Sequence, residues 1–159
     1  MGGYFGCGIS YLLVKNYVSY STTSFAYLLE PQIGFLYFSD DLQDVYWGRL
    51  ILQEVLQTFV FTLVYLVLKY DAVLSKTDRI LKGVCLCFIL LACLSMTRSS
   101  GGCLNPAIGL AQSTYMLGLL PAGSDVASNA KFMWVYILMP FLGAILAACL
   151  YFFHASVED

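Results

Sequence analysis

Three apolar runs limit what this chain can fold into, because two are long enough to cross the hydrocarbon core of a membrane and the other is only slightly short. A spanning helix needs about 20 mostly apolar residues. The runs occupy residues 50–68, residues 83–97 with an extension back to Ile80, and residues 132–153. The chain is 60% hydrophobic and 11% charged, whereas a soluble domain carries about a quarter charged residues. We therefore expect an all-α integral membrane protein embedded in the lipid bilayer.

A fourth apolar stretch, residues 105–118, is too short to span the membrane. As a helix it would be about 21 Å long, against a hydrocarbon core of about 30 Å. It opens on Asn105 and Pro106, a good helix start, since asparagine caps backbone N–H groups and proline suits the first helical position. Gly118 and Pro121 end it. A short, charge-free stretch of this kind indicates a re-entrant half-helix.

The region before these runs has a different character. Residues 2–20 form a weaker span candidate, whose glycines favour close packing on another helix. Residues 17–38 are rich in Ser, Thr and aromatic side chains, which favour the membrane boundary, so we interpret them as an interfacial or partner-bound connector. The expected division is an N-terminal helix and connector at 1–48, a membrane unit at 49–153 and a polar tail at 154–159.

The charges predict an orientation and exclude one class of partner. The first two runs are joined by a segment with four basic residues, Lys69, Lys76, Arg79 and Lys82. The positive-inside tendency puts this segment on the cytosolic or matrix-like side. The net charge of −2 provides no basic surface of the kind that binds nucleic acid, so no nucleic-acid partner is expected.

Neither a catalytic nor a metal site is expected. The two-residue spacing of Cys85 and Cys87 does not suit a zinc site, and the cysteines in the apolar runs are interpreted as small buried apolar side chains. His154 is the single histidine and has no convergent carboxylates in the sequence. We therefore predict no catalytic residues, no metal, no cofactor and no enzymatic activity.

Three groups of residues carry a family resemblance. They are the loop Ser100-Gly101-Gly102-Cys103-Leu104-Asn105-Pro106-Ala107, the group Glu54, Thr58 and Phe59 in the first run, and the group Trp134-Val135-Tyr136, Pro140, Gly143-Ala144 and Tyr151 in the last run. Over residues 49–153 the chain resembles the aquaporin and glycerol-facilitator family. That family's fold has two inverted repeats, each with three spans and one half-helix. The resemblance implies an aquaporin-like half, with the choice between first and second repeat left open.

The resemblance also implies roles for individual residues. Asn105, Pro106 and Ala107 correspond to the pore motif, where Asn105 either donates its amide to water in a pore or only caps the half-helix. Glu54 would accept hydrogen bonds from the loop before Asn105, with a proton-relay carboxylate as the alternative. Cys93, Gly102 and Ile108 are candidates for the constriction. With Ile108 where the second repeat carries an arginine, that constriction would be apolar and hold water poorly.

Two functions follow from these features. The first is a structural, non-conducting aquaporin-like subunit of a larger membrane assembly, which Ile108 and Cys93 favour. The second is half of a channel for water or small neutral solutes, completed by a second copy or a partner chain, which Glu54 and the intact Asn105 motif favour. The expected membrane is organellar, with the mitochondrial inner membrane as the hypothesis.

Overall fold

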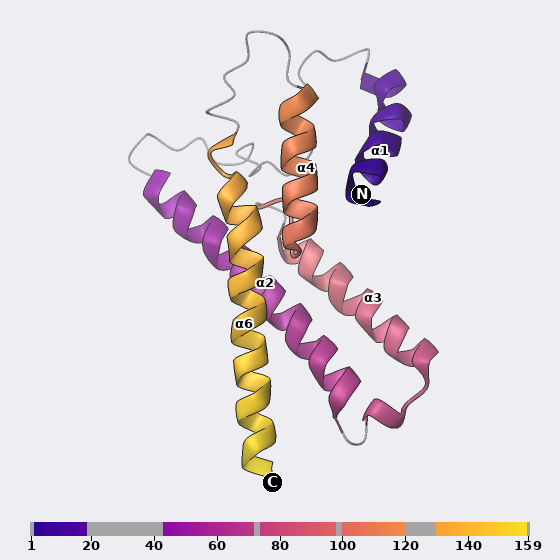
Figure 1. The fold of residues 1–159 in the computed structure, drawn as a ribbon, viewed down its shortest axis with the longest axis vertical. Helices are drawn as coiled ribbons and strands as arrows, with labels where there is room; N and C mark the ends of the chain where they lie inside the picture. Colours follow the sequence, from indigo (N-terminus) through magenta and orange to yellow (C-terminus); the bar gives the residue numbers. More distant parts are fainter. Residues whose placement is uncertain (1, 19–42, 72–73, 98–99, 120–129, 159) are drawn as a thin grey trace.

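The computed structural model of the chain describes residues 2–18, 43–71, 74–97, 100–119 and 130–158, and most of them are helical. Within those residues there is no β-strand, and the all-α prediction is confirmed. The elements, in chain order, are α1 (Gly2–Val18), α2 (Gln43–Tyr70), the short 3-10 helix η3 (Leu74–Lys76), α3 (Arg79–Met96), α4 (Pro106–Leu119) and α6 (Met133–Glu158) (Figure 1).

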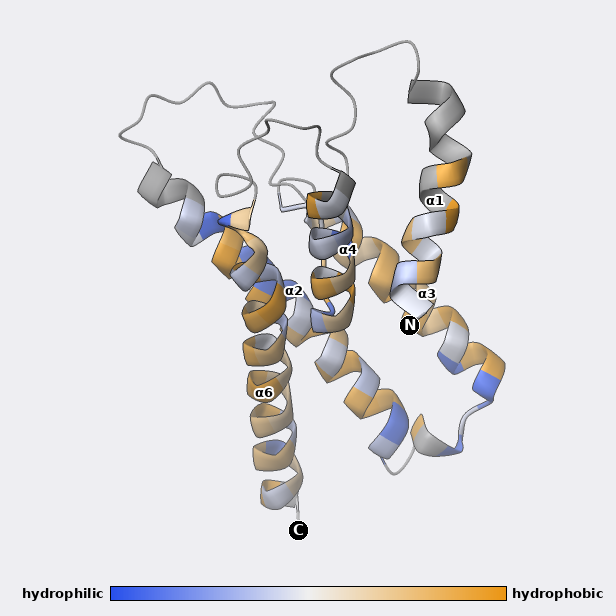
Figure 2. Cartoon of the chain, turned by 45° about the horizontal axis from the view of Figure 1, so that its top comes forward, coloured by the Kyte–Doolittle hydropathy of each residue, from blue (hydrophilic) through white to orange (hydrophobic). Residues whose placement is uncertain are grey.

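Three of these helices are long and apolar enough to cross a membrane. The stretches are Trp47–Tyr70 in α2, Arg79–Met96 in α3 and Met133–Val157 in α6. They coincide with the three predicted runs, which confirms them. Figure 2 shows hydrophobic residues over most of α3 and α6, with hydrophilic residues gathered where α2 turns into α3. At 14 residues, α4 is the shortest of the described α-helices and too short to span, as predicted for the half-helix.

The crossing of α2 and α6 forms the centre of the molecule (Figure 1). Gly143 of α6 permits this crossing, because a Cβ there would collide with the Val55 carbonyl oxygen and lie 3.0 Å from the Thr58 Cβ. Small residues allow helix backbones to approach closely in membranes, where no hydrophobic force drives helices together. The rings of Trp47 and Phe132 pack against each other near the N-terminal ends of α2 and α6, with centroids 4.6 Å apart.

The half-helix α4 lies between the first part of α6 and the N-terminal helix α1 (Figure 1). A contact between α1 and α4 is made at Gly3, where an added Cβ would lie 3.0 Å from the Ala111 Cβ. The Tyr4 and Thr114 hydroxyls form a hydrogen bond of 2.8 Å in the same contact. The predicted N-terminal helix is therefore present. The predicted connector falls almost wholly outside the described residues, and the three-part division of the chain stays a prediction.

Candidate functional site at the start of the half-helix

The chain leaves α3 through a tight turn organised by Thr97. Its N–H and its hydroxyl both donate to the Cys93 carbonyl, at 3.1 and 3.0 Å. The N–H groups of Ser100 and Gly101 in turn donate to the Thr97 carbonyl, at 3.0 and 2.9 Å. These bonds satisfy backbone groups that would otherwise stay unpaired at the end of a helix. The loop that follows brings the chain against α2.

The loop after this turn has three residues in the left-handed backbone region. Their φ angles are +87° at Gly101, +66° at Gly102 and +55° at Leu104. Glycine adopts this region without steric cost, whereas a side chain such as leucine does not. Leu104 is therefore held by contacts outside its own dipeptide, since such a conformation costs about 1–3 kcal/mol and persists only where the surroundings impose it.

Glu54 of α2 supplies those contacts. Its carboxylate is fully buried. One oxygen accepts a hydrogen bond from the Cys103 N–H and the other from the Leu104 N–H, each at 3.2 Å. The Ser100 side chain hydrogen-bonds to the same carboxylate. The hydrogen bonds that the resemblance implied for Glu54 are thus present, and they satisfy an irregular loop that no water would reach within a membrane.

Tyr136 of α6 holds the same loop from the opposite side. Its hydroxyl donates to the Ser100 carbonyl at 2.5 Å. Its own carbonyl oxygen lies 3.4 Å from the Cys103 thiol, which also donates to the Asn105 carbonyl at 3.0 Å. Sequence reasoning did not select Tyr136 as a site residue. The signal was available, because a tyrosine inside an apolar span needs a partner for its hydroxyl.

Gly109 is the second site residue that sequence reasoning missed. A Cβ at this position would collide with the Tyr136 carbonyl oxygen and lie 2.9 Å from the Cys103 sulfur. Only a glycine lets the first turn of α4 rest directly on the backbone of α6. A glycine in the interior of a short helix, where it lowers helix propensity, was the available signal for such a close approach.

Asn105 forms the N-cap of α4. Its side-chain oxygen accepts the Ala107 N–H at 2.9 Å, and its carbonyl accepts the Gly109 N–H at 2.9 Å. The capping role is therefore observed directly. Asn105 and Ala107 are nonetheless exposed on the surface of the chain, and Pro106 is half-buried. Besides the side-chain oxygen that accepts the cap bond, Asn105 has amide N–H groups that can donate to a ligand outside the chain.

The three predicted constriction residues lie in different environments. Ile108 is 42% exposed and follows the Asn105 motif directly. Gly102 is half-buried in the loop. Cys93 is only 1% exposed, and its thiol lies 3.8 Å from the Gln57 carbonyl oxygen of α2. The structure therefore does not bring Cys93 onto a surface shared with Ile108, and a constriction formed by these residues stays a prediction.

No metal-binding group of three or more His, Cys, Asp or Glu side chains occurs among the described residues. What the site offers instead is the exposed N-terminal end of a half-helix. Its backbone is held by one buried carboxylate and one buried tyrosine from two crossing helices. An arrangement of this kind can present hydrogen-bond donors and a partial positive charge to a small molecule.

Residues 1–151 match the sequence profile described as "Major intrinsic protein". The chain belongs to the major intrinsic protein family. Members of this family are membrane channels and not enzymes, which agrees with the expectation that this chain is not an enzyme. The match starts at residue 1, so it includes the N-terminal helix as well as residues 49–151 of the unit expected at 49–153.

One curated relative is the "Glycerol uptake facilitator protein-like 6" of Lactiplantibacillus plantarum. It is 36% identical to this major intrinsic protein over 102 residues, which is 64% of the chain and 42% of the relative. The aligned part thus spans about two fifths of that protein's length. No solved structure matches the chain significantly.

The glycine at position 102 gives a testable prediction. Gly102→Ala should lower the stability of the fold by at least about 1 kcal/mol, because alanine is disfavoured at a positive φ and its Cβ would collide with the Thr97 hydroxyl. Adding Thr97→Ala should recover part of the loss. Gly118→Ala, where a Cβ meets open space, is the control. Thermal unfolding in detergent measures all four proteins, and an equal Tm for Gly102→Ala and the control would contradict this loop geometry.

Proposed function

We propose that this major intrinsic protein supplies one half of a pathway for water or small neutral solutes. Its α4 is the half-helix that presents Asn105 to the pathway. The other half-helix would come from another segment of polypeptide, a second copy or a partner chain. The observation that carries the proposal is the exposure of Asn105 and Ala107 at the N-terminal end of α4.

The physical reason is the polarity of a helix N-terminus. The first N–H groups of a helix have no partner within it, and only the Ala107 N–H is capped by the Asn105 side chain. Each unsatisfied group in hydrocarbon costs several kcal/mol, so this end requires water or a polar partner. The positive end of the helix dipole disfavours cations, which supports a neutral solute. The name of the curated relative, a glycerol facilitator, supports the same class.

The second candidate is the non-conducting subunit, in which another chain covers the same surface and no pathway forms. The exposed Ile108 beside Asn105 favours it, because an apolar residue there holds water poorly. Either partner arrangement, with a second copy or with other membrane subunits, is compatible with an integral membrane location. The comparisons do not support the mitochondrial inner membrane, and the proposal does not include it.

Vesicle swelling distinguishes the two candidates. The tagged chain would be isolated with whatever assembles with it, reconstituted into vesicles and followed by stopped-flow light scattering under water and glycerol gradients. We expect flux above empty vesicles from the assembly, and from the chain alone only where two copies complete the pathway. An assembly that swells no faster than empty vesicles would support the non-conducting subunit instead.

The variant Asn105→Asp tests the role of the amide. Aspartate keeps the side-chain oxygen that caps Ala107, so the half-helix should stay folded. It removes the amide donors and adds a negative charge, so flux should fall by about tenfold or more, the equivalent of losing one hydrogen bond to a solute and disturbing the field of the helix end. Unchanged flux in a folded Asn105→Asp assembly would show that Asn105 does not line the pathway.

A further inference from the structure

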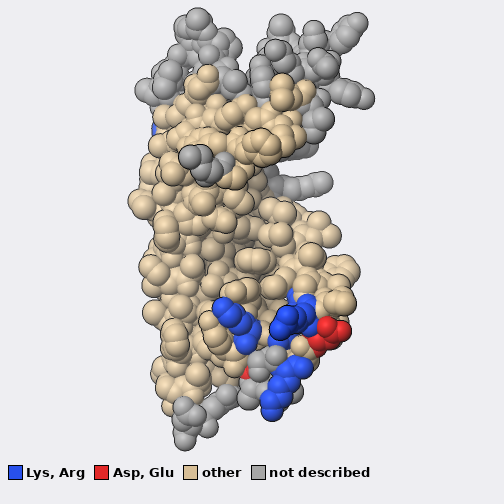
Figure 3. Space-filling model, turned by 45° about the vertical axis from the view of Figure 1, so that its right-hand side comes forward, with Lys and Arg blue, Asp and Glu red and all other residues tan. Residues whose placement is uncertain are grey.

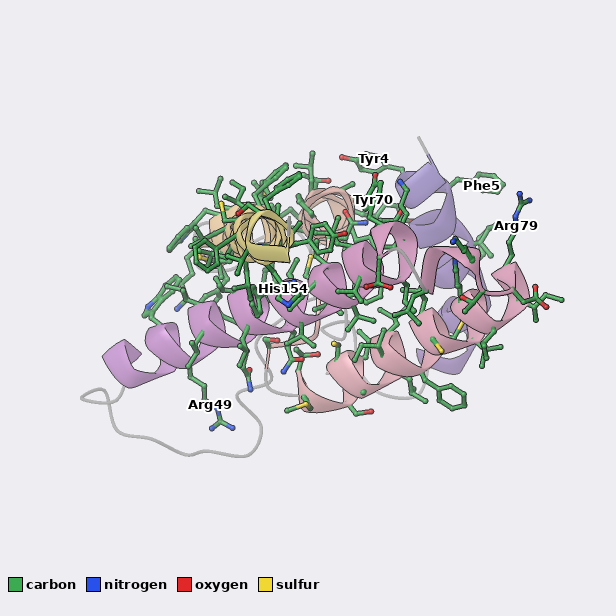
Figure 4. All side chains as sticks on the ribbon, turned by 90° about the horizontal axis from the view of Figure 1, so that it is seen from below. Tyr4, Phe5, Arg49, Tyr70, Arg79 and His154 are labelled. Atoms are coloured by element: carbon green, nitrogen blue, oxygen red, sulfur yellow. The ribbon has the colours of Figure 1, made fainter. Side chains whose placement is uncertain are left out.

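The turn between α2 and α3 gathers cations at one end of the molecule. Lys69, Lys76 and Arg79 are exposed there, and Lys82 follows on α3. Figure 3 shows several basic side chains, with an acidic one beside them, near the base of a face that is largely uncharged above them. Arg79 extends away from the helices, as Figure 4 shows. The cluster is therefore presented to the surroundings of the protein and not to its own core.

The acidic residues of this turn accept hydrogen bonds from its backbone. Asp71 accepts the Leu74 N–H at 2.9 Å at the start of η3, and Asp78 accepts the Ile80 N–H at 3.1 Å as the N-cap of α3. Residues 69–82 hold four basic and two acidic side chains, a net charge of +2. The acids thus have a local role in forming the turn, and the segment as a whole remains positively charged.

The cations lie beside groups that belong to the membrane boundary. The Lys69 ammonium lies 4.9 Å from the centroid of the Tyr70 ring and 5.5 Å from that of Tyr65. Tyrosine is enriched at the level of the lipid headgroups, with its ring toward the acyl chains and its hydroxyl toward water. On α3, Arg79 is followed at once by the strongly exposed apolar side chains of Ile80 and Leu81.

We propose that this turn binds the headgroups of acidic phospholipids. The exposed apolar residues of α3 would contact the acyl chains, while Lys69, Lys76 and Arg79 meet the phosphate of the same lipids. Arginine suits this contact because its guanidinium donates two parallel hydrogen bonds to a phosphate. Basic residues beside a membrane span attract anionic lipids, an effect that falls off within a Debye length.

The test is the association of spin-labelled lipids with the full chain in phosphatidylcholine vesicles. Spin-labelled phosphatidylglycerol should be motionally restricted by the protein more strongly than spin-labelled phosphatidylcholine, at low salt. In Lys76→Gln/Arg79→Gln the association constant of phosphatidylglycerol, relative to that of phosphatidylcholine, should fall by about fivefold for each cation removed. The two lipids should then associate with the protein about equally. The exchange variant Lys76→Arg/Arg79→Lys should keep the preference, because both charges remain.

A matched control removes the same charge elsewhere. Arg49 and Lys131 are exposed cations at the opposite end of the spans, so Arg49→Gln/Lys131→Gln changes the net charge equally. Equal losses in the two double variants would overturn the proposal, since the effect would then follow net charge alone. So would a wild type without preference for phosphatidylglycerol, or a preference abolished by millimolar inorganic phosphate, which would indicate a site for soluble anions.

Discussion

Replacing Glu54 with leucine is expected to lower the free energy of unfolding by about 2–6 kcal/mol, because a buried N–H left without its acceptor costs about 1–3 kcal/mol. Two such groups, of Cys103 and Leu104, donate to this carboxylate. Glu54→Gln keeps one of the two acceptor oxygens and a similar shape. Glu54→Gln should therefore lower the free energy of unfolding by about half as much as Glu54→Leu.

Two measurements check this order. Unfolding of the full chain by denaturing detergent in mixed micelles gives the stability of both variants. Hydrogen exchange at the amides of residues 103 and 104 should accelerate strongly in Glu54→Leu and less in Glu54→Gln. Equal stability of the two variants would falsify the view that the carboxylate acts as a double acceptor. Unchanged exchange at those amides would show that other groups hold the loop.

How much of this fold can be predicted from the sequence depends on whether each interaction joins residues that are near or far apart in the chain. The spans follow from the length of apolar runs, and the half-helix follows from a run that is too short and begins with Asn105 and Pro106. These are local features, set by the solvent and by helix caps. Their ends in the structure lie within a few residues of the predicted ones, apart from α2, whose helix begins well before the apolar run.

The parts that could not be predicted depend on contacts between distant residues. The hydrogen bond from Tyr136 to Ser100 joins residues 36 apart, and it exists only because α6 crosses α2 beside the loop. Leu104 has a positive φ against its own preference, since tertiary contacts hold it. Cys93 faces α2 through a helix–helix packing that residue spacing does not reveal.

The packing of the N-terminal region also depends on contacts between residues far apart in the chain. Its glycines indicated close packing, and α1 does pack closely on α4 at Gly3. The sequence did not name α4 as its partner, and the resemblance was recognised only from residue 49. The family match from residue 1 includes this helix. The glycines of α1 suit close packing on another helix, but they do not identify which helix that is.

A second large effect is expected at Gly143, where α6 crosses α2. Gly143→Ala should destabilise the chain by about 1–3 kcal/mol, because the new Cβ would collide with the Val55 carbonyl oxygen and lie 3.1 Å from the Phe59 nitrogen. Backbone atoms of a helix cannot move aside as a side chain can, so α2 and α6 must separate. Since Glu54 lies one residue before Val55, that separation should also loosen the loop at the start of α4.

Gly83→Ala is the matched control, because Gly83 lies on α3 and a Cβ there meets nothing within 4 Å. Alanine has a higher helix propensity than glycine by about 1 kcal/mol, so the control should be neutral or more stable than the wild type. The two identical substitutions should thus change stability in opposite directions, as measured by detergent unfolding. Hydrogen exchange at residues 103 and 104 should rise in Gly143→Ala alone. A Gly143→Ala protein as stable as the control would mean that α2 and α6 do not cross at this distance. The conclusion that the two helices together support the loop would then be wrong.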